Sequence, residues 1–203
     1  MKIFCVGRNY ADHAKELGNA VPEEPVIFMK PKTALLQPNA PFYYPEFSNE
    51  LHYEAEVVLR ISKNGKYIQE SEADQYYDAF TIGIDFTARD LQAELKKKGL
   101  PWEKAKAWDN SAVIGNWILF TPELRKNPIH FSLQKNKETV QTGDTTDLIF
   151  SFNTVLAHIS QYFSVNIGDL IYTGTPAGVG ECVTNDVLEG FYEKEKVFAL
   201  EVK

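Results

Sequence analysis

The sequence predicts an α+β fold that is built mainly on antiparallel or mixed β-sheets. Two observations support this class. Segments with strand character outweigh those with helical character along the 203 residues. Their order is not the regular alternation of strand and helix that is typical of a parallel sheet. The length suits one hydrophobic core, so we expect residues 1–203 to form a single domain.

Strands are expected where apolar residues run continuously or alternate with polar ones. The segment "ELHYEAEVVLRI" shows the alternation most clearly, and the following Asn64-Gly65 favours a two-residue hairpin turn. "DLIYTGTPAGVG" reads as a strand that runs into a glycine-rich loop. The expected strands lie at 2–6, 26–30, 51–61, 80–86, in most of 113–150, at the start of 169–180, and at 196–202.

Helices are expected where apolar residues recur with helical spacing and where suitable residues mark the ends. The strongest pattern is 87–99, which carries lysines in its last turn and ends at Gly99. Three further segments fit less strongly: 9–18, 71–80 and 152–163. Residues 31–50 contain four prolines and are expected to form a loop.

Composition excludes several classes of protein. The net charge of −7 argues against a nucleic-acid partner or an anionic membrane, since both require a basic surface. Hydrophobic residues make up 44%, yet no run approaches the 18 apolar residues of a membrane span. The start of the chain has too short an apolar stretch for a signal peptide. Cys5 and Cys182 are too few for a disulfide framework, so we expect a cytoplasmic protein.

Two acids in the alternating segment have two interpretations. Glu54 and Glu56 lie two residues apart on the same face of the predicted strand. A half-buried strand commonly shows such residues to water. Alternatively, side chains at i and i+2 are about 6.5 Å apart, so both carboxylates can bind one cation.

Asp85 stands in an otherwise apolar run, "FTIGIDFTA", where an unpaired charge is costly. It could cap a helix, although Thr87 and Asp90 already match a capping pattern, or it could pair with Arg89. Alternatively, it is a third ligand beside Glu54 and Glu56. Three carboxylates without histidine or cysteine would suit a hard cation, Mg²⁺ first, with Mn²⁺ or Ca²⁺ as alternatives.

Two further features are compatible with a site. His13 and Glu16 are three residues apart in a predicted helix, so they share a face. They are either an ordinary surface pair or a general base with the carboxylate that orients it. The glycines of residues 173–180 indicate either a plain turn or backbone amides that bind an anion.

Taken together, several blocks resemble the fumarylacetoacetate hydrolase family, and most closely its small acylpyruvase and oxaloacetate decarboxylase branch. They occur in the family's order between residues 7 and 180. The blocks are "GRNYADHAKELG", "FMKP", "HYEAEVVLRI", "IGIDFTARDLQ", "KKGLPWEKAKAWD" and "IGDLIYTGTPAGVG".

The resemblance implies roles for individual residues. The metal ligands would be Glu54, Glu56 and Asp85, usually with Mg²⁺. His13 and Glu16 would form a catalytic dyad on a mobile lid, and Lys106 would be catalytic, with Lys104 as a neighbouring alternative. The residues expected to contact the substrate are Arg8, Lys30, Arg89, Gln92 and Thr175. The implied fold is a mixed β-roll or sandwich core of the family's C-terminal-domain type with peripheral helices, commonly assembled as a homodimer.

The implied activity is that of a metal-dependent hydrolase or lyase of small 2-oxo acids. It would cleave acylpyruvates, decarboxylate oxaloacetate, or do both, through a metal-stabilised enolate. The alternative is isomerisation of 2-hydroxyhepta-2,4-diene-1,7-dioate. The chain departs from the family pattern at Lys32 and at Asn185-Asp186. It also shows no additional N-terminal domain, which disfavours fumarylacetoacetate itself as substrate.

Overall fold

The computed structural model describes residues 1–11, 21–38 and 40–203, and it confirms the predicted α+β class. The helices are α2 Arg89–Lys98, α3 Glu103–Lys106 and α4 Phe152–Tyr162, with 3₁₀ helices at Lys32–Ala34, Glu70–Tyr76, Leu124–Lys126 and Thr145–Asp147. The strands are β1 Ile3–Gly7, β2 Val26–Lys30, β3 Leu51–Tyr53, β4 Ala55–Ile61, β5 Tyr77–Asp85, β6 Thr87–Ala88, β7 Ala112–Ile114, β8 Ile118–Leu119, β9 His130–Lys135, β10 Glu138–Asp144, β11 Leu170–Tyr172, β12 Gly180–Glu181, β13 Val187–Tyr192 and β14 Glu195–Glu201.

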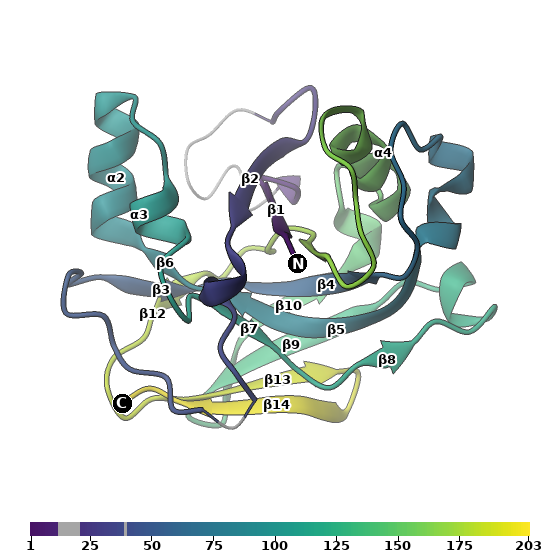
Figure 1. The fold of residues 1–203 in the computed structure, drawn as a ribbon. Helices are drawn as coiled ribbons and strands as arrows, with labels where there is room; N and C mark the ends of the chain where they lie inside the picture. Colours follow the sequence, from purple (N-terminus) through teal and green to yellow (C-terminus); the bar gives the residue numbers. More distant parts are fainter. Residues whose placement is uncertain (12–20, 39) are drawn as a thin grey trace.

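The strands of the described residues form three sheets. The largest has the order β2-β1-β11-β4-β5-β7, with β8 also paired to β5. It is mixed, because β1 and β11 are parallel while its other pairs are antiparallel. A second, antiparallel sheet has the order β10-β9-β13-β14, and β13 and β14 lie beneath β5 in Figure 1. The short third sheet is β12-β3-β6.

The main core lies between the two larger sheets. Leu59 and Phe80 from the mixed sheet and Leu133 and Leu188 from the antiparallel one are all fully buried in the same cluster. Burying a side chain of this size contributes about 1.5–3 kcal/mol to stability. Helices α2 and α3 lie at one end of the sheets and α4 at the other (Figure 1). No helix in the described ranges is long and apolar enough to cross a membrane.

Two local predictions between β4 and β5 need correction. The range 71–80 is not one helix, since residues 71–76 belong to the 3₁₀ helix Glu70–Tyr76 and residues 77–80 to β5. Asn64-Gly65 does not form a two-residue hairpin, because Gly65 instead makes a bridge to Val165. In both places, pairing with a distant strand or segment outweighs the local preference of the sequence.

Candidate active site

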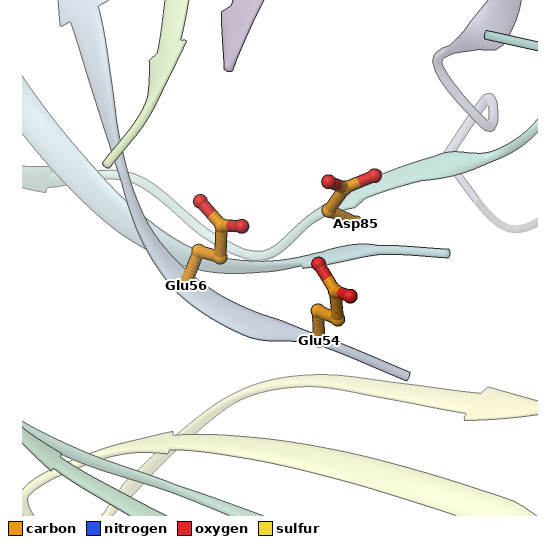
Figure 2. A group of neighbouring side chains, drawn as sticks. All are labelled: Glu54, Glu56 and Asp85. Carbon is orange, nitrogen blue, oxygen red and sulfur yellow. The ribbon is translucent and has the colours of Figure 1, made fainter. Parts of the chain in front are cut away.

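Three carboxylates converge at one end of the mixed sheet, and Figure 2 shows them drawn together. Glu54 lies between β3 and β4, Glu56 belongs to β4, and Asp85 is the last residue of β5. Strands β4 and β5 are paired, and the Asp85 N–H donates to the Glu54 carbonyl oxygen at 2.9 Å. One oxygen from each side chain lies within 4.8 Å of the others. The structure thus brings together the three acids that the sequence analysis proposed as ligands of one cation.

Burial excludes the interpretation of these glutamates as a wet strand face. Glu54 is 6% exposed, Glu56 2% and Asp85 1%. Burial, and then the charges of Asp85 and Glu54, raise the pKa of Glu56 well above its ordinary value. Three buried carboxylates therefore repel one another, and a divalent cation would offset that repulsion. A donor set made only of carboxylate oxygens fits Mg²⁺, Mn²⁺ or Ca²⁺, so these residues fit the expected ion.

Two buried lysines balance part of this charge. The Lys106 ammonium donates to Glu54 Oε2 at 2.7 Å and to Asp85 Oδ2 at 2.8 Å. Lys30 lies 2.6 Å from Asp85 Oδ1 and also donates to the Ser111 hydroxyl and carbonyl oxygens. Burial alone lowers the pKa of Lys106, but the carboxylates of Asp85 and Glu54 outweigh it and raise the pKa. Lys106 is thus a charged, buried ammonium, whereas Lys104 is exposed.

The local explanations for Asp85 are wrong. Its side chain neither caps α2 nor pairs with Arg89, because Lys30 and Lys106 take both of its oxygens. The capping pattern that the sequence suggested is also unused. Ala88 is the N-cap of α2, and Asp90 instead accepts from the hydroxyl of Ser48.

Arg89 is held on three sides at the start of α2. One terminal nitrogen donates to Glu54 Oε1, and the other donates to Gln92 Oε1 at 2.6 Å. Its Nε donates to Nδ1 of His52 at 3.3 Å. Such a guanidinium has little freedom, so it holds Glu54 in a fixed orientation. His52 was not singled out in the sequence, where it reads as an ordinary polar strand residue.

The glycine-rich loop closes the opposite side of the triad. The Gly174 N–H donates to Glu56 Oε2 at 2.6 Å. Gly174 has φ +104°, and a β-carbon there would lie 2.7 Å from the β-carbon of Asn9. Asn9 is fully buried and donates to the Thr173 carbonyl oxygen at 2.8 Å. The loop is therefore more than a plain turn, but the Gly174 amide serves Glu56 and is not free for an external anion.

Gln141 connects this loop to the start of β4, and the sequence analysis did not identify it. Its side-chain oxygen accepts from the Ala55 N–H at 2.9 Å, and its nitrogen donates to Thr175 Oγ1 at 2.9 Å. Gln141 lies on β10 at a shift in register against β9, which is typical of a β-bulge. Bulges re-aim side chains beside active sites. A bulge has no clear sequence signal, since "ETVQTGD" reads as a plain strand.

A cavity beside the triad collects most of the residues expected to contact substrate. Its lining includes Arg8, Arg89, Gln92, Lys106 and Thr175 together with the three acids. Lys30 pairs with Asp85 but is not part of the lining. The remaining lining residues are Val6, Gly7, Phe28, Lys96 and Trp102. His13 and Glu16 lie outside the described residues.

Comparison with known proteins agrees with this geometry. A model of the C-terminal domain of fumarylacetoacetate (FAA) hydrolase matches residues 2–201. The chain is 40% identical over 187 residues to a protein of Mus musculus named oxaloacetate tautomerase FAHD1, mitochondrial. That match covers 92% of this chain and 85% of the mouse protein.

Two solved structures are also similar. A fumarylpyruvate hydrolase from Pseudomonas aeruginosa, in complex with Mn²⁺ and pyruvate, has a TM-score of 0.91 and 34% identity, covering 100% of this chain and 88% of that one. A 5-carboxymethyl-2-hydroxymuconate delta-isomerase from Mycobacterium smegmatis has a TM-score of 0.85 and 32% identity. The match covers 99% of this chain and 77% of the isomerase chain. The named relatives are thus enzymes with different reactions.

Proposed function

Because the chain belongs to the fumarylacetoacetate hydrolase family, we propose that it is a divalent-metal-dependent enzyme of small 2-oxo acids. The chemistry that the related reactions share is formation of the substrate's enolate. Interconversion of the keto and enol forms of oxaloacetate is the first activity to test, and decarboxylation of oxaloacetate requires the same enolate. The observation that carries the proposal is the buried triad of Glu54, Glu56 and Asp85 with the Lys106 ammonium on two of its members.

The triad would hold the metal ion through its carboxylate oxygens. When bound, such an ion supplies a Lewis acid for the 2-oxo oxygen of the substrate. The similar hydrolase from Pseudomonas aeruginosa was solved with Mn²⁺ and pyruvate, which supports a divalent ion and a 2-oxo acid in this type of site. We propose Mg²⁺ as the ion for this chain, with Mn²⁺ or Ca²⁺ as alternatives.

The protein's own residues would bind the substrate and balance its charge. The buried ammonium of Lys106 would stabilise negative charge that develops on the substrate as a proton leaves carbon 3. Arg89 and Gln92 would orient the substrate from α2, since both line the cavity. The hydroxyl of Thr175, fixed by Gln141, would donate to the substrate carboxylate.

Lys106 and Lys104 provide a matched test of this proposal. Tautomerisation and decarboxylation of oxaloacetate would be measured with Mg²⁺, with Mn²⁺ and with a chelator. We expect chelation to abolish activity and Lys106→Met to lower kcat by at least about 100-fold, because a buried charge beside the reacting atoms is lost. Lys104→Met removes an exposed charge of the same helix and should change kcat by less than about twofold. Activity that persists in chelator or in Lys106→Met would refute the proposal.

Hydrolysis of acylpyruvates is the second candidate, and the similarity to a fumarylpyruvate hydrolase favours it. This reaction needs an activated water, for which we propose His13 as general base and Glu16 as its orienting carboxylate. Glu16→Gln should then lower acetylpyruvate hydrolysis strongly while sparing oxaloacetate decarboxylation. If both rates fall by the same factor, the dyad serves to position substrate and not to activate water.

A further inference from the structure

Positive charge exceeds negative charge around the cavity as far as the structure describes the chain. Among the described residues, Lys30, Lys106 and Arg89 each make an ion pair with a carboxylate of the triad. Arg8 and Lys96 also line the cavity, and neither has an ion pair or a hydrogen bond from its side chain within the described ranges. With Lys30, which pairs with Asp85 from outside the lining, five cations of the described chain stand near three carboxylates, a formal surplus of two positive charges before any metal binds.

Arg8 is presented to the cavity by a constrained backbone. It follows β1 and has φ +62°, a conformation that is uncommon for a residue with a side chain. The next residue, Asn9, is fully buried, and its side chain bonds the backbone of Thr173 and of Phe150. Strain of this kind persists where the surroundings enforce it, often at ligand sites. The backbone of Arg8 is therefore held in place, while no carboxylate of the described residues pairs with its guanidinium.

Lys96 faces the cavity from α2. It lies four residues after Gln92 and seven after Arg89, so the three share one face of the helix. Its ammonium lies over the ring of Trp102, 5.5 Å from the ring centroid. Arg8, Arg89 and Lys96 all line this one cavity, and burial, followed by the charges of Arg89 and Arg8, lowers the pKa of Lys96. Its side chain nevertheless keeps access to solvent.

We propose that Lys96, together with Arg8, binds the second carboxylate of a 2-oxo dicarboxylate and so determines the enzyme's specificity for dianionic substrates. This inference rests on the proposed function and specifies its substrate class. A substrate with one carboxylate would leave the repulsion between these two cations uncompensated. A second carboxylate between them would accept charge-assisted hydrogen bonds from both.

Two pairs of compounds that differ in a second carboxylate test the role of Lys96. Turnover would be measured with oxaloacetate and with acetylpyruvate, which has one carboxylate. Binding would be measured by calorimetry with malate and with 2-hydroxybutanoate, which differ only in a terminal carboxylate or methyl group. We expect Lys96→Met to raise the KM for oxaloacetate and the Kd for malate by about 10- to 100-fold. The KM for acetylpyruvate and the Kd for 2-hydroxybutanoate, the two monoanions, should change by less than about twofold. Lys96→Arg should restore most of the affinity for oxaloacetate and malate.

Lys97→Met is the matched control, because Lys97 is an exposed lysine of the same helix, as Lys96 is, but does not line the cavity. It should leave all four constants unchanged. If Lys96→Met affects dianions and monoanions equally, or affects neither, the inference is wrong while the proposed function stands. If the wild-type protein turns over neither substrate, the proposed function fails. The malate measurement then still decides whether Lys96 selects a second carboxylate.

Discussion

Asp169 and Asp85 are both fully buried acids at strand ends of the same mixed sheet, yet their surroundings are opposite. Asp169 accepts from the backbone N–H groups of Lys2 and Asn166 and pairs with the Lys2 ammonium at 2.6 Å. Asp85 instead faces two carboxylates and two lysines, and no backbone amide of the described residues donates to its side chain.

The difference separates a structural acid from one that we propose to act in the site. Backbone amides satisfy Asp169 permanently, so its charge stabilises the fold and is not available to a ligand. The carboxylates of the triad are kept close to one another at a cost in free energy. Acids that are both buried and mutually repelling mark a place where a cation or substrate binds. Burial alone does not distinguish the two cases.

Of the four substitutions considered, Glu56→Gln should have the largest effect on function, because it removes one of the three carboxylates of the triad. The change removes charge but keeps an acceptor for the Gly174 N–H. We expect Mg²⁺ or Mn²⁺ to lose its stabilising effect in thermal unfolding and activity to fall by at least about 100-fold. In chelator, stability should stay the same or rise, because a repulsion is removed. A clear loss of stability in chelator would instead show that Glu56 is a structural acid like Asp169.

Asp169→Asn should show the opposite pattern. Removing this buried charge leaves the Lys2 ammonium without its partner and weakens the contacts to two backbone amides. We expect the free energy of unfolding to fall by about 3 kcal/mol. The activity of the folded variant and its response to Mg²⁺ should match those of the wild type. Urea unfolding measures the loss of stability. If the folded variant no longer responds to Mg²⁺, Asp169 is not a purely structural acid.

Gln141→Leu tests the link between the triad and the glycine-rich loop. It leaves the Ala55 N–H and the Thr175 hydroxyl without their buried partner. We expect activity to fall by about 10-fold, because residues that support a site at one remove typically contribute 10- to 100-fold. Gln134→Leu is the control, since it removes an amide from the neighbouring strand β9, outside the cavity lining. Equal effects of the two variants would mean that Gln141 acts only through stability.

Asp78→Asn should have the smallest effect of the four on stability, because the ion pair that it removes is exposed and that of Asp169 is buried. Asp78 makes two good hydrogen bonds with Arg60, at 2.8 and 2.9 Å, but its side chain is 43% exposed. Exposed pairs of this kind contribute about 0.2–1 kcal/mol. Thermal unfolding in low and high salt should show a small loss that salt reduces further. A loss as large as that of Asp169→Asn would contradict this ranking by burial.

The sequence by itself determined the class of the fold and the chemistry of the site. The alternation of 51–61 predicted one strand through Glu54 and Glu56; the structure has Glu56 on β4 and interrupts the strand at Glu54, between β3 and β4. Gly99 marked the end of α2, where the structure has it with φ +65°. These features are local, because strand period and helix ends depend on neighbouring residues. The ordered blocks likewise indicated the family, since they could be read directly from the chain.

Only the tertiary structure decided which residues meet. It buried the polar face of β4, and it divided the expected helix at 71–80 between a 3₁₀ helix and the start of β5. It also placed Lys106, the lysine that the resemblance favoured over Lys104, against the triad. It also brought Gln141 to the glycine-rich loop through a bulge, and Lys96 to the cavity through the facing of α2. Such contacts join residues far apart in the chain, and their free energies depend on burial and strand pairing that no local pattern records.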